Sequence, residues 1–79
     1  MYRVKFTLRS NPGLYNTFLR AIESLESEVG PKRADILFAL EDRHGAKLIS
    51  QHYTKKEDQQ EYIFQFPDEK TYSLFLLRF

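Results

Sequence analysis

The sequence predicts an α+β domain in which one amphipathic helix packs on one face of an antiparallel β-sheet. Residues 2–9 alternate between apolar and polar side chains, and residues 14–29 carry an apolar stripe at helical spacing. Much of the remaining chain consists of short apolar segments separated by turn-forming residues. Because a single amphipathic helix covers only one face of a sheet, we expect an antiparallel sheet with the helix and a short helical turn packed on one side.

The first two elements have the clearest patterns. The strand over residues 2–9 is predicted by a period of two, with Tyr2, Val4, Phe6 and Leu8 on one face. Asn11 is then expected to cap a helix that has Pro12 in its first turn. The helix is predicted over residues 14–29 by apolar residues three and four positions apart, and Gly30-Pro31 is expected to end it. The members of this stripe are Tyr15, Phe18, Ile22, Leu25 and Val29.

Residues 33–53 are expected to form a second and a third strand joined by a hairpin. Ile36, Phe38 and Leu40 alternate within residues 33–42, although a short helix also fits this segment. The tetrapeptide 42–45 ends in glycine and resembles a hairpin turn. Residues 46–53 are less apolar and predict a more exposed strand.

The last third of the chain is expected to contain a polar loop, a strand, a helical turn and a final strand. The loop covers residues 54–60, and the strand alternates through Tyr62, Phe64 and Phe66 up to Pro67. Asp68 is expected to cap a short helical turn over residues 69–73. Residues 74–79 favour a strand because they are rich in apolar side chains, with one helix over residues 68–79 as the alternative.

The resulting order is β-α-β-β-β-(short α)-β, which is similar to a ferredoxin-like fold with an added hairpin strand. We expect residues 1–79 to form one compact domain, because 79 residues are too few for two cores. Such an architectural analogy implies nothing about function.

Composition argues against most enzyme classes. The chain has no cysteine, and its three glycines are isolated, so neither a thiolate nor a phosphate-binding loop is expected. The two histidines, His44 and His52, are placed on or near one predicted hairpin without a recognisable ligand spacing. We therefore expect a protein that is not an enzyme and that uses no cofactor or metal.

Nucleic-acid binding on a basic sheet face is the alternative function. Basic residues lie on the first strand, at the start of the second and in the polar loop, and aromatic residues of a sheet can stack on bases. The formal net charge of only +1 argues against a dedicated nucleic-acid binder. The candidate residues are Arg3, Lys5, Arg9, Lys32, Arg33, Lys55 and Lys56.

Protein binding is the favoured function, because seven Phe and five Tyr exceed what a small core needs. The expected partner is another protein or a second copy of the chain as a homodimer. Small chains without catalytic motifs are also common among phage and mobile-element inhibitors of host machinery, such as defence systems. The candidate contact residues are Tyr53, Tyr62, Tyr72 and Phe79.

A cytoplasmic location without membrane association is expected. The N-terminal segment alternates apolar and basic residues and so lacks the apolar core of a signal peptide. The longest apolar run, residues 74–77, is far shorter than the roughly 20 residues that a transmembrane helix needs.

Overall fold

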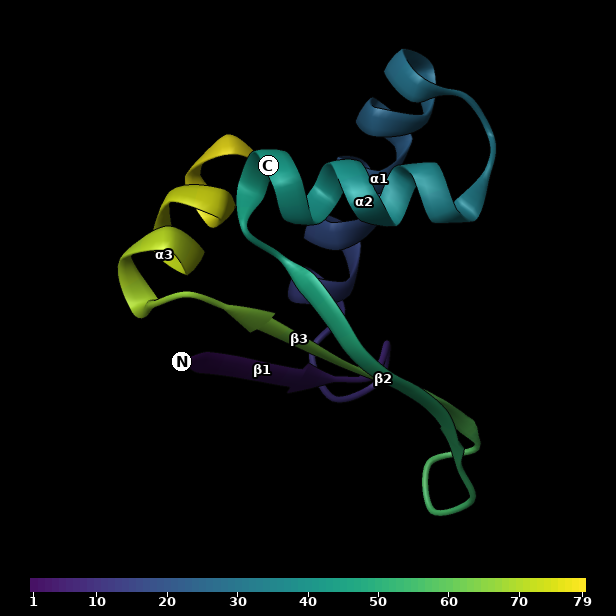
Figure 1. Cartoon of the computed structure of the whole chain (residues 1–79). Coiled ribbons are helices and arrows are strands. Elements are labelled where there is room, and N and C mark those ends of the chain that lie inside the picture. Colours follow the sequence, from purple (N-terminus) through teal and green to yellow (C-terminus); the bar gives the residue numbers. More distant parts are fainter.

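The computed structural model describes all residues 1–79 and contains three helices above a three-stranded antiparallel sheet (Figure 1). The sheet order is β1-β3-β2, so the first strand of the chain pairs with the last. In chain order the elements are β1 (Tyr2–Phe6), α1 (Pro12–Val29), α2 (Arg33–His44), β2 (Lys47–Thr54), β3 (Gln59–Phe66) and α3 (Glu69–Arg78). The α+β class and the antiparallel sheet are therefore confirmed.

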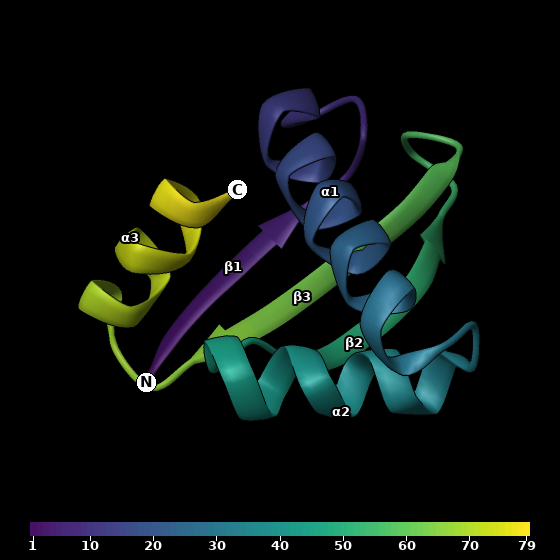
Figure 2. The same cartoon turned by 90° about the horizontal axis from the view of Figure 1, so that it is seen from above.

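Helix α1 begins and ends as the sequence predicts. The Asn11 side chain accepts a hydrogen bond from the Leu14 amide at 3.0 Å, and Pro12 occupies the first turn. Gly30 ends the helix with a positive φ of 96°. Helix α1 crosses the sheet diagonally above β3 (Figure 2). Phe18 and Leu25, two residues of its apolar stripe, are almost fully buried.

Residues 33–42, expected to form a strand, instead belong to helix α2. Ile36, Ala39 and Leu40 are buried, and their spacing of three and one is that of a helical face. Phe38, which a strand would place beside Ile36 and Leu40, is 72% exposed. The expected hairpin turn is in fact the helix end, because Gly45 adopts the left-handed conformation and donates to the Glu41 carbonyl.

The final strand expected over residues 74–79 is also wrong, because the helical turn after Asp68 continues as α3. Asp68 caps this helix by accepting from the Thr71 amide at 2.7 Å. Tyr72, Phe75 and Phe79 then follow at intervals of three and four, and Phe75 is 2% exposed. Two of the five predicted strands are thus helices, and the ferredoxin-like order is replaced by β-α-α-β-β-α.

The β2–β3 hairpin is longer and its turn shorter than expected. Strand β3 begins at Gln59 rather than at Tyr62, so only residues 55–58 lie outside the two strands. Asp58 takes a positive φ of 55° in this turn. A register shift between Leu48 and Ser50 leaves Ile49 as a bulge in β2.

All three helices lie on the same side of the sheet, which leaves the second face open (Figures 1 and 2). The hydrophobic core fills the space between the sheet and the helices and consists of 13 buried residues. Five of them are phenylalanines, and Phe18 stacks on Phe64 with ring centroids 4.1 Å apart. The aromatic residues Phe6, Phe64 and Phe66 face the helices, as their alternation predicts.

Candidate functional site

An apolar groove lies between α1, α2 and the sheet. It has a volume of about 250 Å³ and is open to solvent. Ten of its twelve lining residues are hydrophobic, and Arg33 is the only charged one. We call this feature the helix-side groove.

Each wall of the helix-side groove comes from a different element. Helix α1 contributes Tyr15, Phe18, Leu19 and Ile22, and α2 contributes Ile36 and Leu37. The floor is formed by the sheet residues Phe6, Leu48, Tyr62 and Phe64. Pro31 and Arg33 close the end at which α2 begins. Helix α1 crosses above β3, while α2 packs against α1 and lies beside β2 (Figure 2).

Tyr62 is the one predicted partner-binding residue that lies in the groove. Its ring packs on Phe6 with centroids 5.6 Å apart and meets Tyr15 at 6.2 Å. Both tyrosines are partly exposed, so they offer ring surface to a ligand while packing on the core. Aromatic side chains of this kind are frequent in the centre of protein interfaces.

The other three predicted contact residues lie elsewhere and do not form one surface with Tyr62. Tyr53 is in β2 near the hairpin tip, where its hydroxyl donates to Asp58. Tyr72, in α3, packs on Tyr2 and Phe66. Burial raises the pKa of the Tyr72 hydroxyl, and the nearby Tyr2 raises it further. Phe79 packs on Phe75 and His44. Tyr72 and Phe79 thus attach α3 to the core.

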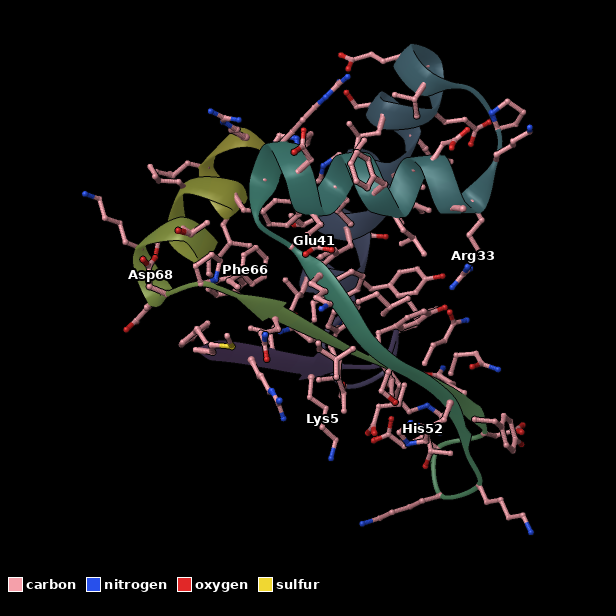
Figure 3. All side chains as sticks on the ribbon, viewed as in Figure 1. Lys5, Arg33, Glu41, His52, Phe66 and Asp68 are labelled. Atoms are coloured by element: carbon pink, nitrogen blue, oxygen red, sulfur yellow. The ribbon has the colours of Figure 1, made fainter.

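The basic residues of the nucleic-acid alternative are also divided among several places. Arg3 and Lys5 project from β1 on the open face of the sheet, as Figure 3 shows for Lys5. Lys32 and Arg33 lie instead at the start of α2 on the helix side (Figure 3). The remaining three lie in loops, Arg9 after β1 and Lys55 and Lys56 in the β2–β3 turn.

The open face of the sheet is polar and lacks a stacking platform. Arg3 donates to Gln65 at 3.0 Å, and Glu61 pairs with both Lys5 and His52, at 3.7 and 3.0 Å. Strand pairing places no aromatic ring here other than the imidazole of His52. The residues on this face are Arg3, Lys5, Lys47, Ser50, His52, Thr54, Gln59, Glu61, Ile63 and Gln65. Sheet modules that bind RNA rely on aromatic residues at such positions.

The hairpin on or near which the two histidines were expected is not formed, because the segment before Gly45 is helix α2. His44 ends α2, whereas His52 lies on the open face (Figure 3). Burial lowers the pKa of His44, and the nearby Arg78 and Arg43 lower it further. No group of three or more potential metal-ligating side chains is present.

Sequence reasoning missed the groove itself. Its α1 wall was visible only as an unusually wide apolar stripe, in which Leu19 lies beside Tyr15 and Ile22. Its second wall was hidden because residues 33–42 were expected to be a strand, which would not have placed Leu37 and Arg33 opposite α1.

None of the three helices combines the length and the apolar character that a membrane-spanning segment needs. Comparison with protein-family models, with curated proteins and with solved structures finds no match to this chain. The function must therefore be inferred from the geometry alone.

Proposed function

We propose that this protein is a binding module that acts without catalysis and that recognises a protein partner through the helix-side groove. The observation that carries the proposal is the groove itself, in which ten hydrophobic residues line a solvent-open depression of about 250 Å³. Covering apolar surface is worth roughly 25 cal/mol per Å², so a partner side chain that fills the groove gains free energy from the contact. The groove's partly exposed Tyr15 and Tyr62 are of the type that contributes strongly at interfaces.

The narrower proposal is that the protein belongs to a phage or mobile element and inhibits host machinery, such as a defence system. It requires only that the captured partner loses its activity while the groove is occupied. No catalytic group is needed for inhibition of this kind.

The proposal is tested by capturing partners with two matched leucine variants. Leu19 lines the groove and is 42% exposed, whereas Leu8 lies in the loop after β1, outside the groove, and is 44% exposed. We expect Leu19→Glu to abolish capture of a partner from a lysate of the cells in which the protein is made, because the new carboxylate must be desolvated at the contact. Leu8→Glu is expected to keep it. The protein is immobilised through Met1, which is 93% exposed, and captured proteins are measured by quantitative mass spectrometry.

Capture that survives Leu19→Glu, with both variants folded by circular dichroism, contradicts the proposal. Light scattering on the purified protein separates a homodimer from a different partner, since only a homodimer doubles the mass without lysate.

Nucleic-acid binding remains the alternative, and the cations Arg3, Lys5 and Lys47 on the open face favour it over an enzymatic role. It requires a single-stranded oligonucleotide to bind with an affinity that falls steeply as salt rises, because phosphate contacts release counterions. Loss of this binding in Arg3→Gln, and not in Leu19→Glu, would replace our proposal with the alternative.

A further inference from the structure

The electrostatics of the helix-side groove restrict the partner more narrowly than its apolar lining does. Arg33 is the only charged residue among the twelve that line it. The guanidinium of Arg33 donates to the amide oxygen of Gln51, which is a neutral acceptor. The ion pairs of the molecule are Lys5–Glu61, Arg43–Glu28 and His52–Glu61, so no carboxylate of this chain neutralises Arg33.

Arg43, at the other end of the same helix, provides the contrast. Arg43 pairs with Glu28 at the end of α1 and thereby joins the two helices. Arg33 makes no ion pair with α1 and instead lines the groove at the end where α2 begins. Figure 3 shows Arg33 at this end of the helix. Its charge is therefore available to a group that comes from outside the chain.

Two further features make this end of the groove positive. Lys32 precedes Arg33, is exposed and takes part in no ion pair. No side chain caps α2, because the residue at the cap position is Lys32 in an extended conformation. The backbone amides of the first turn therefore add their partial positive charge to those of the two side chains. Asp35, the acid of this turn, does not line the groove.

We infer that the helix-side groove binds a segment of a partner polypeptide in which a large apolar side chain is next to a carboxylate. This inference rests on the proposed function and specifies the chemistry of its partner. The apolar side chain, such as that of phenylalanine or leucine, fills the groove between Leu19, Leu37 and Tyr62. The carboxylate, from Asp, Glu or a chain terminus, accepts from Arg33.

The exchange at Arg33 is favourable because a carboxylate is a better acceptor than the Gln51 amide. The planar guanidinium matches a carboxylate with two parallel hydrogen bonds, and charge-assisted bonds of this kind are about twice as strong as neutral ones. Arg33 thus selects acidic segments among all those that have a suitable apolar side chain.

The test uses a blocked peptide of sequence Ser-Asp-Phe-Leu-Ser and the ¹⁵N-labelled full chain, followed by NMR chemical shifts. We expect shifts at groove residues and a loss of affinity of about tenfold when the peptide's Asp is replaced by Asn. A similar loss is expected for Arg33→Gln with the original peptide. The affinity of the Asn peptide should be the same for the natural chain and for Arg33→Gln, since the two changes remove the same contact.

Arg3→Gln is the matched control, because Arg3 is also exposed and also donates to a glutamine, Gln65, but lies on the open face. It should bind the peptide as the natural chain does. Equal binding of the Asp and Asn peptides overturns the inference. Chemical shifts of groove residues that change with protein concentration in the absence of peptide would also overturn it, because they would show that a second copy of the chain occupies the groove. Binding of octanoate in the groove, with no binding of the peptide, would overturn it as well.

Failure of the inference is distinguishable from failure of the proposed function. If Leu19→Glu abolishes partner capture and Arg33→Gln leaves it unchanged, the groove is the binding site but the partner segment is not acidic. If neither variant changes capture, the proposed function fails as well.

Discussion

At the scale of single residues, Gly45 is the position at which the fold depends most on the absence of a side chain. Its φ of 74° is left-handed, and it lets the chain leave α2 and enter β2 within three residues. A Cβ atom at this position would lie 2.9 Å from the Thr71 methyl carbon and 3.2 Å from Pro67 Cδ. Gly45 therefore also sets how closely α3 approaches the end of α2.

Gly45→Ala is expected to destabilise the protein by more than its backbone conformation alone would cost. A left-handed φ and ψ cost an alanine about 1–2 kcal/mol, and the new Cβ at Gly45 also clashes with Thr71 and Pro67. Gly30→Ala is also expected to be destabilising, but through its backbone alone, because φ 96° with ψ −179° is a conformation essentially restricted to glycine and a Cβ there meets no atom within 4 Å. Urea denaturation measures the free energy of unfolding of each variant. A loss in Gly45→Ala no larger than the backbone cost would show that the clash is relieved without cost.

Prediction for single residues succeeded at the helix ends, where the capping chemistry of one residue determines the local structure. Asn11, Gly30 and Asp68 are found at the helix ends where their capping chemistry places them. It failed at Phe38, because alternation over five residues is compatible with a helix that exposes one of its apolar side chains. The exposure of a single phenylalanine depends on what packs above it, which no local pattern contains.

At the scale of elements, the two errors have a common cause. Residues 33–44 and 69–78 are short helices with weak amphipathic patterns, and each exposes large apolar residues, among them Phe38 and Leu77. Their helical character lies in their ends, namely Gly45 after α2 and Asp68 before α3. The apolar content of the two segments favoured strands, whereas the capping residues Gly45 and Asp68 indicated the helices that the structure contains.

His44 links α2 to α3 and makes this contact sensitive to pH. The imidazole meets the Phe79 ring edge-on with centroids 5.1 Å apart, and its Nδ1 lies 3.3 Å from the Arg78 guanidinium. Burial and the charges of Arg78 and Arg43 lower its pKa from 6.5. The unfolded chain therefore binds a proton at His44 more readily than the folded chain does.

The free energy of unfolding is expected to fall as the pH decreases through 6.5, and to level off below the lowered pKa of His44. At a pH well above 6.5 the histidine is neutral in both states, so it causes no pH dependence there. His44→Gln should remove this part of the pH profile, and hydrogen exchange at the α3 amides should show the same change. A profile that keeps its full slope in His44→Gln would assign the pH dependence to other groups.

At the scale of the whole molecule, sequence reasoning predicted the class of the fold and its one-sided arrangement but not its topology. The helices do cover one face, because an amphipathic helix buries its stripe wherever a sheet offers an apolar surface. Which strands pair is a non-local property. The order β1-β3-β2 follows from two segments being helices, so each local error changed the global arrangement.

The candidate site also depends on contacts between residues that are distant in the sequence. Tyr62 and Arg33 were both singled out from the sequence, but for two different functions and on two different surfaces. Only the packing of α2 against α1 brings them to one groove. The basic residues singled out from the sequence are spread over both faces and the loops, which a net charge of +1 does not reveal because it says nothing about where the charges lie.

Strand pairing also separates early from late steps of folding. The β2–β3 hairpin joins neighbouring residues, whereas β1 pairs Tyr2 with Phe66 across nearly the whole chain. Closing the longer loop costs more entropy, so we expect the hairpin to form first. Val4→Ala, which costs about 2 kcal/mol of core burial, should therefore mainly speed unfolding in stopped-flow experiments. Leu48→Ala in β2 should mainly slow folding, and the reverse result would contradict this order.

The same pairing has a consequence for the chain while it is being made. Strand β1 is synthesised first, but its only partner in the sheet, β3, follows roughly 60 residues later. At 5–20 residues per second, this strand waits about 3–12 seconds without its partner. During that time Val4 and Phe6 are exposed on a segment suited to pairing with any other strand, and Arg3 and Lys5 between them supply the charge repulsion that discourages aggregation.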